Sequence, residues 1–419
     1  MPLITLADAV LPLIRTTSRE LWRYSNAMRH GAQMRDGVAI LELAVNDPAT
    51  LPATLEILAP TPEETYRVVH KALASGIRII ARADDSSGVI GDAIRDLIAI
   101  HPVAAAAAHV PALKLADWMW KFHFDEDVDY FELDPVAYAP ALGETGLARL
   151  REHVESLRVQ VAAQPPGERG YSHEAFLLRW FDRRLAVLDG DVDAIIRTHL
   201  REAKVAAWFT DTAKALAEID RYDLAIEWAR KAMEFDRGHQ ARQGADYWWD
   251  LVGEHAPDDL PDAAWTLFRR WPGSDTAARV DRTVGAAARQ EIVAALEATP
   301  SALVYYLVDT VGDVEGAWDA AHRLGLDDRH AWDRLAAAYE EIDPAAAIEV
   351  HLRSVAANLV EANTRAYRPA ARELARLRGI AATSGPETVS LVDATIADLR
   401  ERYRRRPSML DAFDRAHLP

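Results

Sequence analysis

The chain of 419 residues contains no cysteine. This absence excludes disulfide bonds, thiolate nucleophiles, iron–sulfur clusters and cysteine-ligated zinc, and it favours a reducing compartment. Long apolar runs are missing as well, since no stretch approaches ~18 uncharged apolar residues, and no basic region precedes the apolar residues near the N-terminus. We therefore expect a cytoplasmic protein that neither spans a membrane nor is secreted.

The sequence also lacks the motifs of familiar cofactor and catalytic sites. Neither G-x-x-x-x-G-K-[ST] nor G-x-G-x-x-G occurs, and the short stretch GVIG at 88–91 has no lysine to contact a phosphate. There is no G-x-S-x-G and no H-E-x-x-H, and none of the 14 histidines lies four residues from another. We therefore expect no cofactor and no stoichiometric metal, and a non-catalytic protein is favoured over an enzyme.

What the chain does have is acidic charge and ample apolar material. The formal net charge is −17 and half of the residues are hydrophobic. A chain of this length can bury a large core, and its negative field repels nucleic-acid backbones. The composition therefore predicts two or three globular domains, and it disfavours a nucleic-acid partner.

The clearest local pattern is a pair of helices joined by a tight turn, between Phe209 and Asp236. Apolar residues recur at spacings of three and four on both sides of the turn at 220–223. The small residues Ala225, Ala229 and Ala232 allow two helix backbones to approach closely, as they do in tetratricopeptide-like hairpins. We expect this hairpin to be the structural unit of the C-terminal part.

Variants of the second helix of this hairpin recur at irregular intervals, each with a small residue at the position of close approach. They are predicted at Asp223–Met233, Asp262–Arg270, Asp313–Leu324, Pro344–Val355 and Tyr367–Ile380. The pattern predicts a degenerate α-solenoid rather than a regular array.

The N-terminal part also carries helical periodicity. We predict helices over 9–29 and 36–45, a helix that begins at Pro62 with Thr61 as its N-cap, and another that ends at Pro102. Only 76–81 and 103–110 could be read as strands, and helix is favoured for both. The linker-like sequence at 164–170 places a boundary between an N-terminal helical domain, 1–163, and a tetratricopeptide-like domain, 171–419.

Two stretches are not explained by helix packing alone. One is the acidic turn at 84–92, and the other is the segment 114–134, in which aromatic residues alternate with acidic ones. The candidate binding residues in them are Asp84, Asp85, Ser86, Asp92, Lys114, Asp117, Trp118, Lys121, His123, Asp125 and Asp127.

The acidic run at 125–134 has to be accounted for, and a calcium-binding loop is the first possibility. An EF-hand fails, because Tyr130 occupies the position that needs glycine and Val136 the position that needs glutamate. A looser cation site that uses His123, Asp125 and Asp127 stays open. Crowded carboxylates must be solvated, paired or used on a ligand, so the segment forms either a salt-bridged seam that joins the N-terminal domain to the solenoid or an acidic, aromatic-lined site.

A dense basic run near the C-terminus, RERYRRR at 400–406, is the other exceptional composition. Glu401 and Asp398 on the same helix, and Asp411 and Asp414 beyond it, can neutralise much of its charge. We therefore predict a structural role for these arginines rather than phosphate binding.

Several strings resemble a known family, the bacterial SWIM-type zinc-finger proteins with a long helical-repeat region and their relatives without the finger. The matching strings are ADDSSGVIGDA at 83–93, KLADWMWKFHFDEDVDYFELDPVAYAPALGETGLARLR at 114–151, FLLRWFDRRLAVLDGDVDA at 176–194 and the tail 367–418 with LRERYRRRPSML. The family's finger is a C-x-C…C-x-H arrangement, which a chain without cysteine cannot form. The resemblance therefore implies a helical scaffold and neither zinc binding nor finger-dependent DNA contact.

Together these observations predict an all-α protein, a helical-repeat α-solenoid with an N-terminal helical domain. The function expected first is that of an interaction scaffold which presents a groove to a protein or peptide partner. The alternative is an enzyme or small-molecule binder with its site near residues 84–92 and 114–134. The oligomeric state stays open.

Overall fold

The computed structural model describes residues 3–124, 131–165 and 172–419 of the chain. Across this described part the regular structure is helical apart from one isolated bridge between Ile4 and Ile57, which confirms the all-α prediction. The segments 76–81 and 103–110, the only two with any strand character in sequence, lie mostly in helices. The chain divides into two compact units, Met1–Gly244 and Ala245–Pro419, and we describe each unit by itself.

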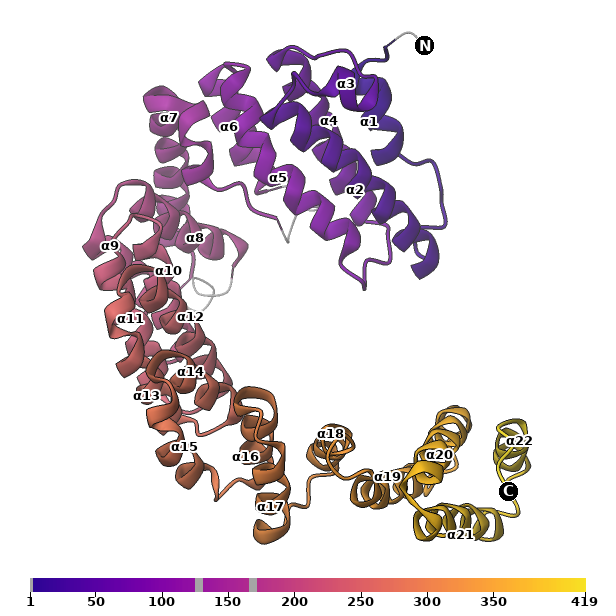
Figure 1. Ribbon diagram of the computed structural model, residues 1–419. Helices are drawn as coiled ribbons and strands as arrows, with labels where there is room; N and C mark the ends of the chain where they lie inside the picture. The colour runs from indigo at the N-terminus through magenta and orange to yellow at the C-terminus, as the bar shows by residue number, and fades with distance from the viewer. Residues whose placement is uncertain (1–2, 125–130, 166–171) are drawn as a thin grey trace. The chain divides into compact units, whose positions relative to one another are not determined.

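The first unit contains helices α1 to α11 and the first part of α12 (Figure 1). Their bounds are α1 Leu6–Ile14, α2 Tyr24–Asn46, α3 Leu51–Leu55, α4 Pro62–Ile80, α5 Val89–Ala107, α6 Ala112–Phe122, α7 Pro135–Ala163, α8 His173–Leu188, α9 Val192–Leu200, α10 Ala206–Ala217, α11 Tyr222–Phe235 and α12 His239–His255. Most helices pack against the next one in sequence, and the pairs α2 with α5, α1 with α4 and α5 with α7 pack together across longer stretches of sequence.

The second unit contains the rest of α12 and the helices up to α22 (Figure 1). Their bounds are α13 Leu260–Arg270, α14 Ser274–Val284, α15 Arg289–Leu296, α16 Pro300–Tyr306, α17 Val314–Leu324, α18 Arg329–Tyr339, α19 Pro344–Asn358, α20 Thr364–Ser384, α21 Pro386–Arg402 and α22 Pro407–Arg415, with a π-helical turn at Leu307–Val311. One apolar core joins α13 to α18, and another joins α19 to α22.

The predicted hairpin is α10 and α11, and the alanines that mark it are fully buried. Ala225, Ala229 and Ala232 have no exposed surface. The same holds for Ala264 of α13 and for the corresponding alanines of α17 and α19. The predicted repeat helices are therefore confirmed as α11, α13, α17, α19 and α20.

The start of α4 also follows its sequence signals. The Thr61 hydroxyl accepts a hydrogen bond from the amide of Glu64, and Pro62 occupies the first turn, where no partner for its missing N–H is needed. In the same way the Asp191 carboxylate caps α9 by accepting from the amide of Ala194. Local capping chemistry is therefore readable from the sequence.

The predicted single helix over 9–29 is wrong. The chain leaves helix after Ile14 and re-enters it at Tyr24. Between them the Thr16 and Ser18 hydroxyls accept hydrogen bonds from backbone amides two residues further on, and such local bonds compete with the helical ladder. Trp22, an apolar residue of this stretch, is 63% exposed.

The predicted helix end at Pro102 is also wrong, because α5 runs through this residue to Ala107. A proline inside a helix removes one backbone hydrogen bond. Here the residues around it, among them Ile100, Ala104 and Ala105, are buried in the core. Packing of this face against the neighbouring helices offsets the lost bond.

The sequence-based boundary at 164–170 lies inside the first compact unit. Helices α7 and α8 on its two sides pack against one another. Leu150 and Val154 of α7 share a core with Leu177 and Phe181 of α8. The compact units therefore divide the chain further along, within α12.

The buried alanines of the hairpin can be tested by enlargement. We expect Ala229→Leu to lower the free energy of unfolding by about 2 kcal/mol, because extra methylene groups in a closely packed site force the two helices apart. Urea denaturation measures the change. Glu227→Leu on the exposed side of α11 is the control and should cost less than about 0.5 kcal/mol; equal effects at both positions would refute close packing.

Candidate functional site

The acidic turn at 84–88 caps the start of α5. The two carboxylate oxygens of Asp85 accept hydrogen bonds from the amides of Ile90, at 2.9 Å, and Gly91, at 2.8 Å. These amides belong to the first turn of the helix, where N–H groups have no helical partner and a negative charge is favourable. Asp84 in turn accepts from the amide of Ser86. Both carboxylates are therefore used on backbone amides.

The other two candidates in this turn are exposed. Asp92 forms an ion pair with Arg95 at 2.6 Å, one turn along the helix, with both side chains more than half exposed. The Ser86 side chain donates no hydrogen bond to any described residue, and no histidine or lysine is paired with it. A serine without an adjacent base is not an activated nucleophile.

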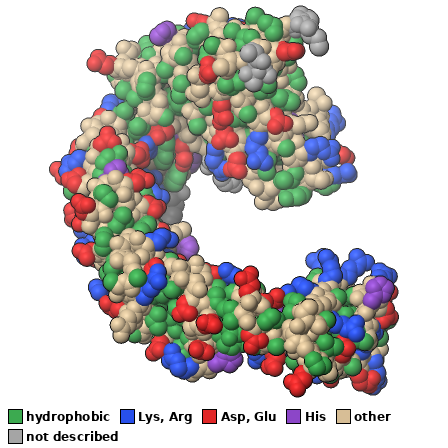
Figure 2. Space-filling model, viewed as in Figure 1, with side chains coloured by type: hydrophobic (Ala, Val, Ile, Leu, Met, Phe, Trp, Pro, Cys, Tyr) green, Lys and Arg blue, Asp and Glu red, His purple; other side chains and the backbone are tan. Residues whose placement is uncertain are grey.

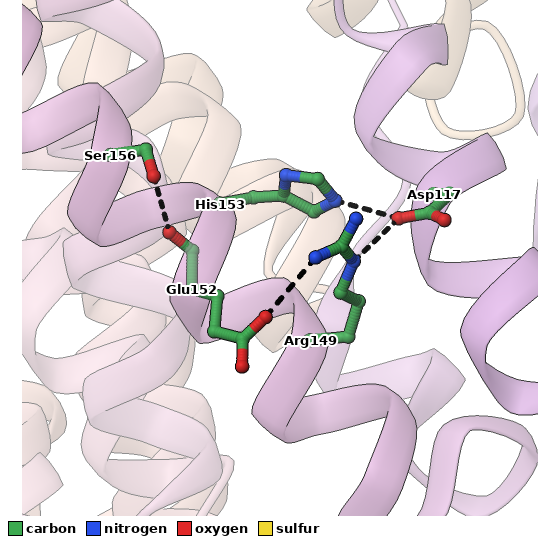
Figure 3. A network of polar contacts seen from close by, with 5 residues as sticks. All are labelled: Asp117, Arg149, Glu152, His153 and Ser156. Atoms are coloured by element: carbon green, nitrogen blue, oxygen red, sulfur yellow. Dashed lines mark hydrogen bonds and ion pairs between the residues drawn. The ribbon is translucent and has the colours of Figure 1, made fainter.

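In the second stretch, Asp117 of α6 is held by two side chains of α7. The Nε of Arg149 and the Nε2 of His153 both lie 2.8 Å from the same Asp117 oxygen, and Arg149 also pairs with Glu152 (Figure 3). These hydrogen bonds lower the pKa of Asp117, that from His153 contributing most. The indole of Trp120 stacks on the His153 ring with 5.0 Å between centroids. The contacts join α6 to α7.

Trp118, on the next position of α6, covers a hydrogen-bonded chain of buried polar groups. Its ring stacks on His101 of α5 at 4.8 Å and also contacts His70 of α4. His101 is fully buried. Its Nε2 lies 3.0 Å from Nδ1 of His70, and its Nδ1 lies 2.8 Å from the hydroxyl of Tyr138 on α7. The chain therefore links three helices through the core.

One arrangement of protons satisfies this chain. The Tyr138 hydroxyl is buried and must donate, so it donates to Nδ1 of His101. The Nε2–H of His101 then donates to Nδ1 of His70. His70 is only partly buried, and it carries its own proton on Nε2. In this arrangement both histidines are neutral.

Burial keeps His70 and His101 neutral. It lowers the pKa of His101 to about 3, with a further contribution from the neighbouring His70, and it also lowers the pKa of His70. The same cause raises the pKa of Tyr138. These hydrogen-bonded groups join α4, α5 and α7.

His123 at the end of α6 is also buried and neutral. Its Nε2 accepts from the amide of Leu133 at 3.4 Å, and its ring lies against those of Trp180 and Phe181. Burial lowers its pKa to about 4. Asp125 and Asp127, with which we combined it in a cation site, lie outside the described residues. Among the described residues no group of three acidic or histidine side chains is placed to hold a metal ion.

The two lysine candidates and Asp134, at the end of the segment, differ in their ion pairing. Lys114 and Lys121 are exposed and form no ion pair with another described residue. Asp134 pairs at 2.6 Å with Arg184 of α8, which also reaches Glu218 beyond α10 at 2.7 Å. No polar contact between described residues joins the turn at 84–92 to the segment 114–134. Asp134 thus pairs across the predicted boundary at 164–170, as in the seam interpretation, whereas Asp117 pairs within the predicted N-terminal domain.

The structure contains a cavity that the sequence did not indicate. It lies between α18, α19 and α20 and has a volume of about 830 Å³. Asp333, His351, Ser354 and Glu373 are among its lining residues. Their positions on three amphipathic helices carry no local motif, so only the packing of these helices brings them together.

The C-terminal arginines are largely occupied by partners in the second unit, where Figure 2 shows Lys and Arg side chains along the last helices. Arg400 pairs with Asp414, Arg402 with Asp398 and Arg404 with Glu401. Arg406 donates to three backbone carbonyls at 359–361. The predicted local ion pairing is confirmed for three of the arginines.

Comparisons with known proteins add little. The sequence matches no protein family and no curated protein. A solved structure described as a circular tandem repeat protein with novel repeat topology and enhanced subunit contact surfaces aligns over 98% of this chain and 96% of its own, with 14% identity and a TM-score of 0.20. At this score the two backbones do not superpose, so the fold description rests on the helices of this chain. Among the described helices, none has the length and apolarity to cross a membrane.

Replacing Asp85 tests whether this residue caps α5 or serves to bind a ligand. We expect Asp85→Ala to lower the free energy of unfolding by about 1–2 kcal/mol, because two amides of α5 lose their acceptor. Thermal or urea denaturation measures this. Ser86→Ala, one residue away and without a side-chain hydrogen bond, should be neutral; an Asp85→Ala protein as stable as the wild type would contradict the capping role.

The buried histidines predict how stability depends on pH. Below about pH 6.5, the ordinary pKa of histidine, the unfolded chain binds protons that folded His101 and His123 do not bind. The free energy of unfolding should therefore fall by about 1.4 kcal/mol per pH unit for each such group down to about pH 4, and should level off above pH 6.5.

Two variants test whether His101 contributes to this dependence of stability on pH. His101→Phe should be less stable at pH 7 and less sensitive to pH, because one proton-binding group is gone. Tyr138→Phe removes the hydroxyl but keeps both histidines, so it should be destabilised at every pH with the slope retained. Urea titrations between pH 4 and 7 measure how the free energy of unfolding changes with pH. An unchanged slope in His101→Phe would show that His101 does not cause the pH dependence.

Proposed function

We propose that the protein is a non-catalytic interaction scaffold that presents a groove of its helical repeats to a protein or peptide partner. The observation that carries this proposal is the cavity between α18, α19 and α20. Successive repeat helices create such hollows by their geometry, and peptide segments are commonly bound in them. A cavity of about 830 Å³ accommodates one or two side chains of a partner.

The two stretches first considered for an enzyme or small-molecule site offer less support. In the turn at 84–92 the Asp85 carboxylate caps α5 and Asp92 pairs with Arg95. In the segment 114–134 Asp117 and Asp134 pair with arginines of other helices. Groups so engaged are not free to bind a substrate. The resemblance to finger-less relatives of SWIM-type proteins is part of this proposal, since it implies a scaffold.

The proposal is tested by filling the cavity. Proteins that the wild type captures from cells are compared with those captured by Ser354→Trp, which places an indole in the cavity, and by Glu349→Trp on the exposed side of the same helix. A candidate partner is then purified and its binding measured by calorimetry. We expect Ser354→Trp to weaken binding at least about tenfold, because the indole occupies the partner's place, and Glu349→Trp to leave it unchanged.

Circular dichroism and melting temperature establish that both variants fold. If every purified partner binds Ser354→Trp as tightly as the wild type, the groove is not the binding surface and the proposal is wrong.

A further inference from the structure

The walls of the cavity between α18, α19 and α20 are partly apolar and partly polar, and their charged residues carry more negative than positive charge. The cavity is lined by residues of these three helices and of the loop between α19 and α20. Asp333, Glu361 and Glu373 contribute carboxylates and Arg329 contributes a guanidinium. An occupant must therefore be complementary to an acidic, acceptor-rich wall.

Asp333 is the carboxylate with unmet hydrogen-bonding capacity. Its Oδ1 is sealed from solvent and accepts no hydrogen bond from any described residue, and the side chain forms no ion pair with one. A buried carboxylate oxygen without a donor is unfavourable by several kcal/mol in general, so such groups normally have a partner. Because the residue lines the cavity, its carboxylate is placed to bind a cationic occupant.

The opposite wall is negative and held in place. Arg376 bridges Glu373, at 2.6 Å, and Glu340, at 2.8 Å. Its hydrogen bond is the main cause that lowers the pKa of Glu340. The Nε2 of His351 lies 2.7 Å from the same Glu340 oxygen, although the ring is poorly aligned for a hydrogen bond. One guanidinium thus compensates two carboxylates, and the wall keeps a negative excess.

Backbone and loop groups add further acceptors. Pro369 has no N–H with which to donate to the carbonyl of Arg365 four residues earlier, so this carbonyl lacks its helical partner. The carboxylate of Glu361, in the loop before α20, forms no ion pair with a described residue. The cavity thus has two lining carboxylates, Asp333 and Glu361, that form no ion pair with a described residue.

Two cations near this wall have to be considered. Arg329, in the first turn of α18, forms no ion pair with a described residue. Arg353 lines an adjoining smaller hollow and lies over the ring of Trp332, 5.6 Å from its centroid. Asp327 lines that hollow as well and offsets one of these charges. Around the main cavity the carboxylates still outnumber the guanidiniums.

We propose that this cavity binds the guanidinium of an arginine side chain in a peptide segment of the partner, with Asp333 as its principal carboxylate. The inference rests on the proposed function and names the chemistry of the partner. Guanidinium carries five N–H donors in a planar fork, which matches a wall with unpaired acceptors better than the ammonium of lysine does.

The test uses short blocked peptides and the full chain. Calorimetry or NMR titration compares acetylated, amidated pentapeptides of alanine with a central arginine, lysine or citrulline. Citrulline has the shape of arginine without its charge. We expect the arginine peptide to bind at least about tenfold more tightly than the citrulline peptide, with the lysine peptide between them. Equal affinities for arginine and citrulline would overturn the inference without needing any variant.

Variants then locate the site. Asp333→Asn should lose about tenfold or more in affinity for the arginine peptide, since the remaining amide oxygen is a weaker partner for a cation. Arg329→Gln removes a like charge and should strengthen binding of the arginine peptide. Glu349→Gln, on the exposed side of α19, is the control and should change nothing. Unchanged affinity in Asp333→Asn would place the arginine elsewhere and refute the site.

Failure of this inference is distinguishable from failure of the scaffold function. A purified partner that needs the open cavity but tolerates replacement of each of its arginines by glutamine would leave the scaffold standing and overturn the inference. An arginine-selective cavity that no cellular partner requires would support the inference and overturn the scaffold function.

Discussion

The close approach of helix backbones at buried small residues is the constraint on which both units depend. Ala225 and Ala229 in the first unit, and Ala264, Ala317 and Ala347 in the second, have no exposed surface. Alanine loses no side-chain entropy on burial and lets two helix axes come together, so dispersion contacts extend along the whole hairpin. Larger residues at these places would separate the helices and open the core.

Polar groups inside the first unit are tolerated because each has a partner. The buried His101 is hydrogen-bonded on both ring nitrogens, and at the surface the exposed Asp117 accepts from two side chains of α7. Burying a polar group without a hydrogen-bond partner would destabilise the fold by more than the surrounding apolar contacts stabilise it. The aromatic rings of Trp118 and Trp120 cover these groups and fix their orientation. The unusual composition of α6 is thereby accounted for by the joining of α4, α5, α6 and α7.

The second unit leaves several buried polar atoms without a hydrogen-bond partner among the described residues, among them Asp333 Oδ1, His351 Nε2 and Trp248 Nε1. Asp333 has a sealed oxygen without a donor among the described residues, whereas Asp281, also in this unit, pairs with Arg289 and accepts from Tyr306. A protein under no demand to bind anything has little reason to keep such a carboxylate in place of an amide or an apolar residue.

The sequence by itself determined the fold class, the repeat helices and the caps at Thr61 and Asp191, because helical periodicity and capping depend on neighbours in the chain. It could not determine that α5 passes through Pro102 or that Trp22 is exposed, because these outcomes depend on packing against distant helices and on competing local hydrogen bonds. The site residues divide in the same way. The turn at 84–92 was visible as a set of cap formers, but the tertiary structure alone brought Asp333, His351 and Glu373 around one cavity, since residues on three separate helices share no signal along the chain.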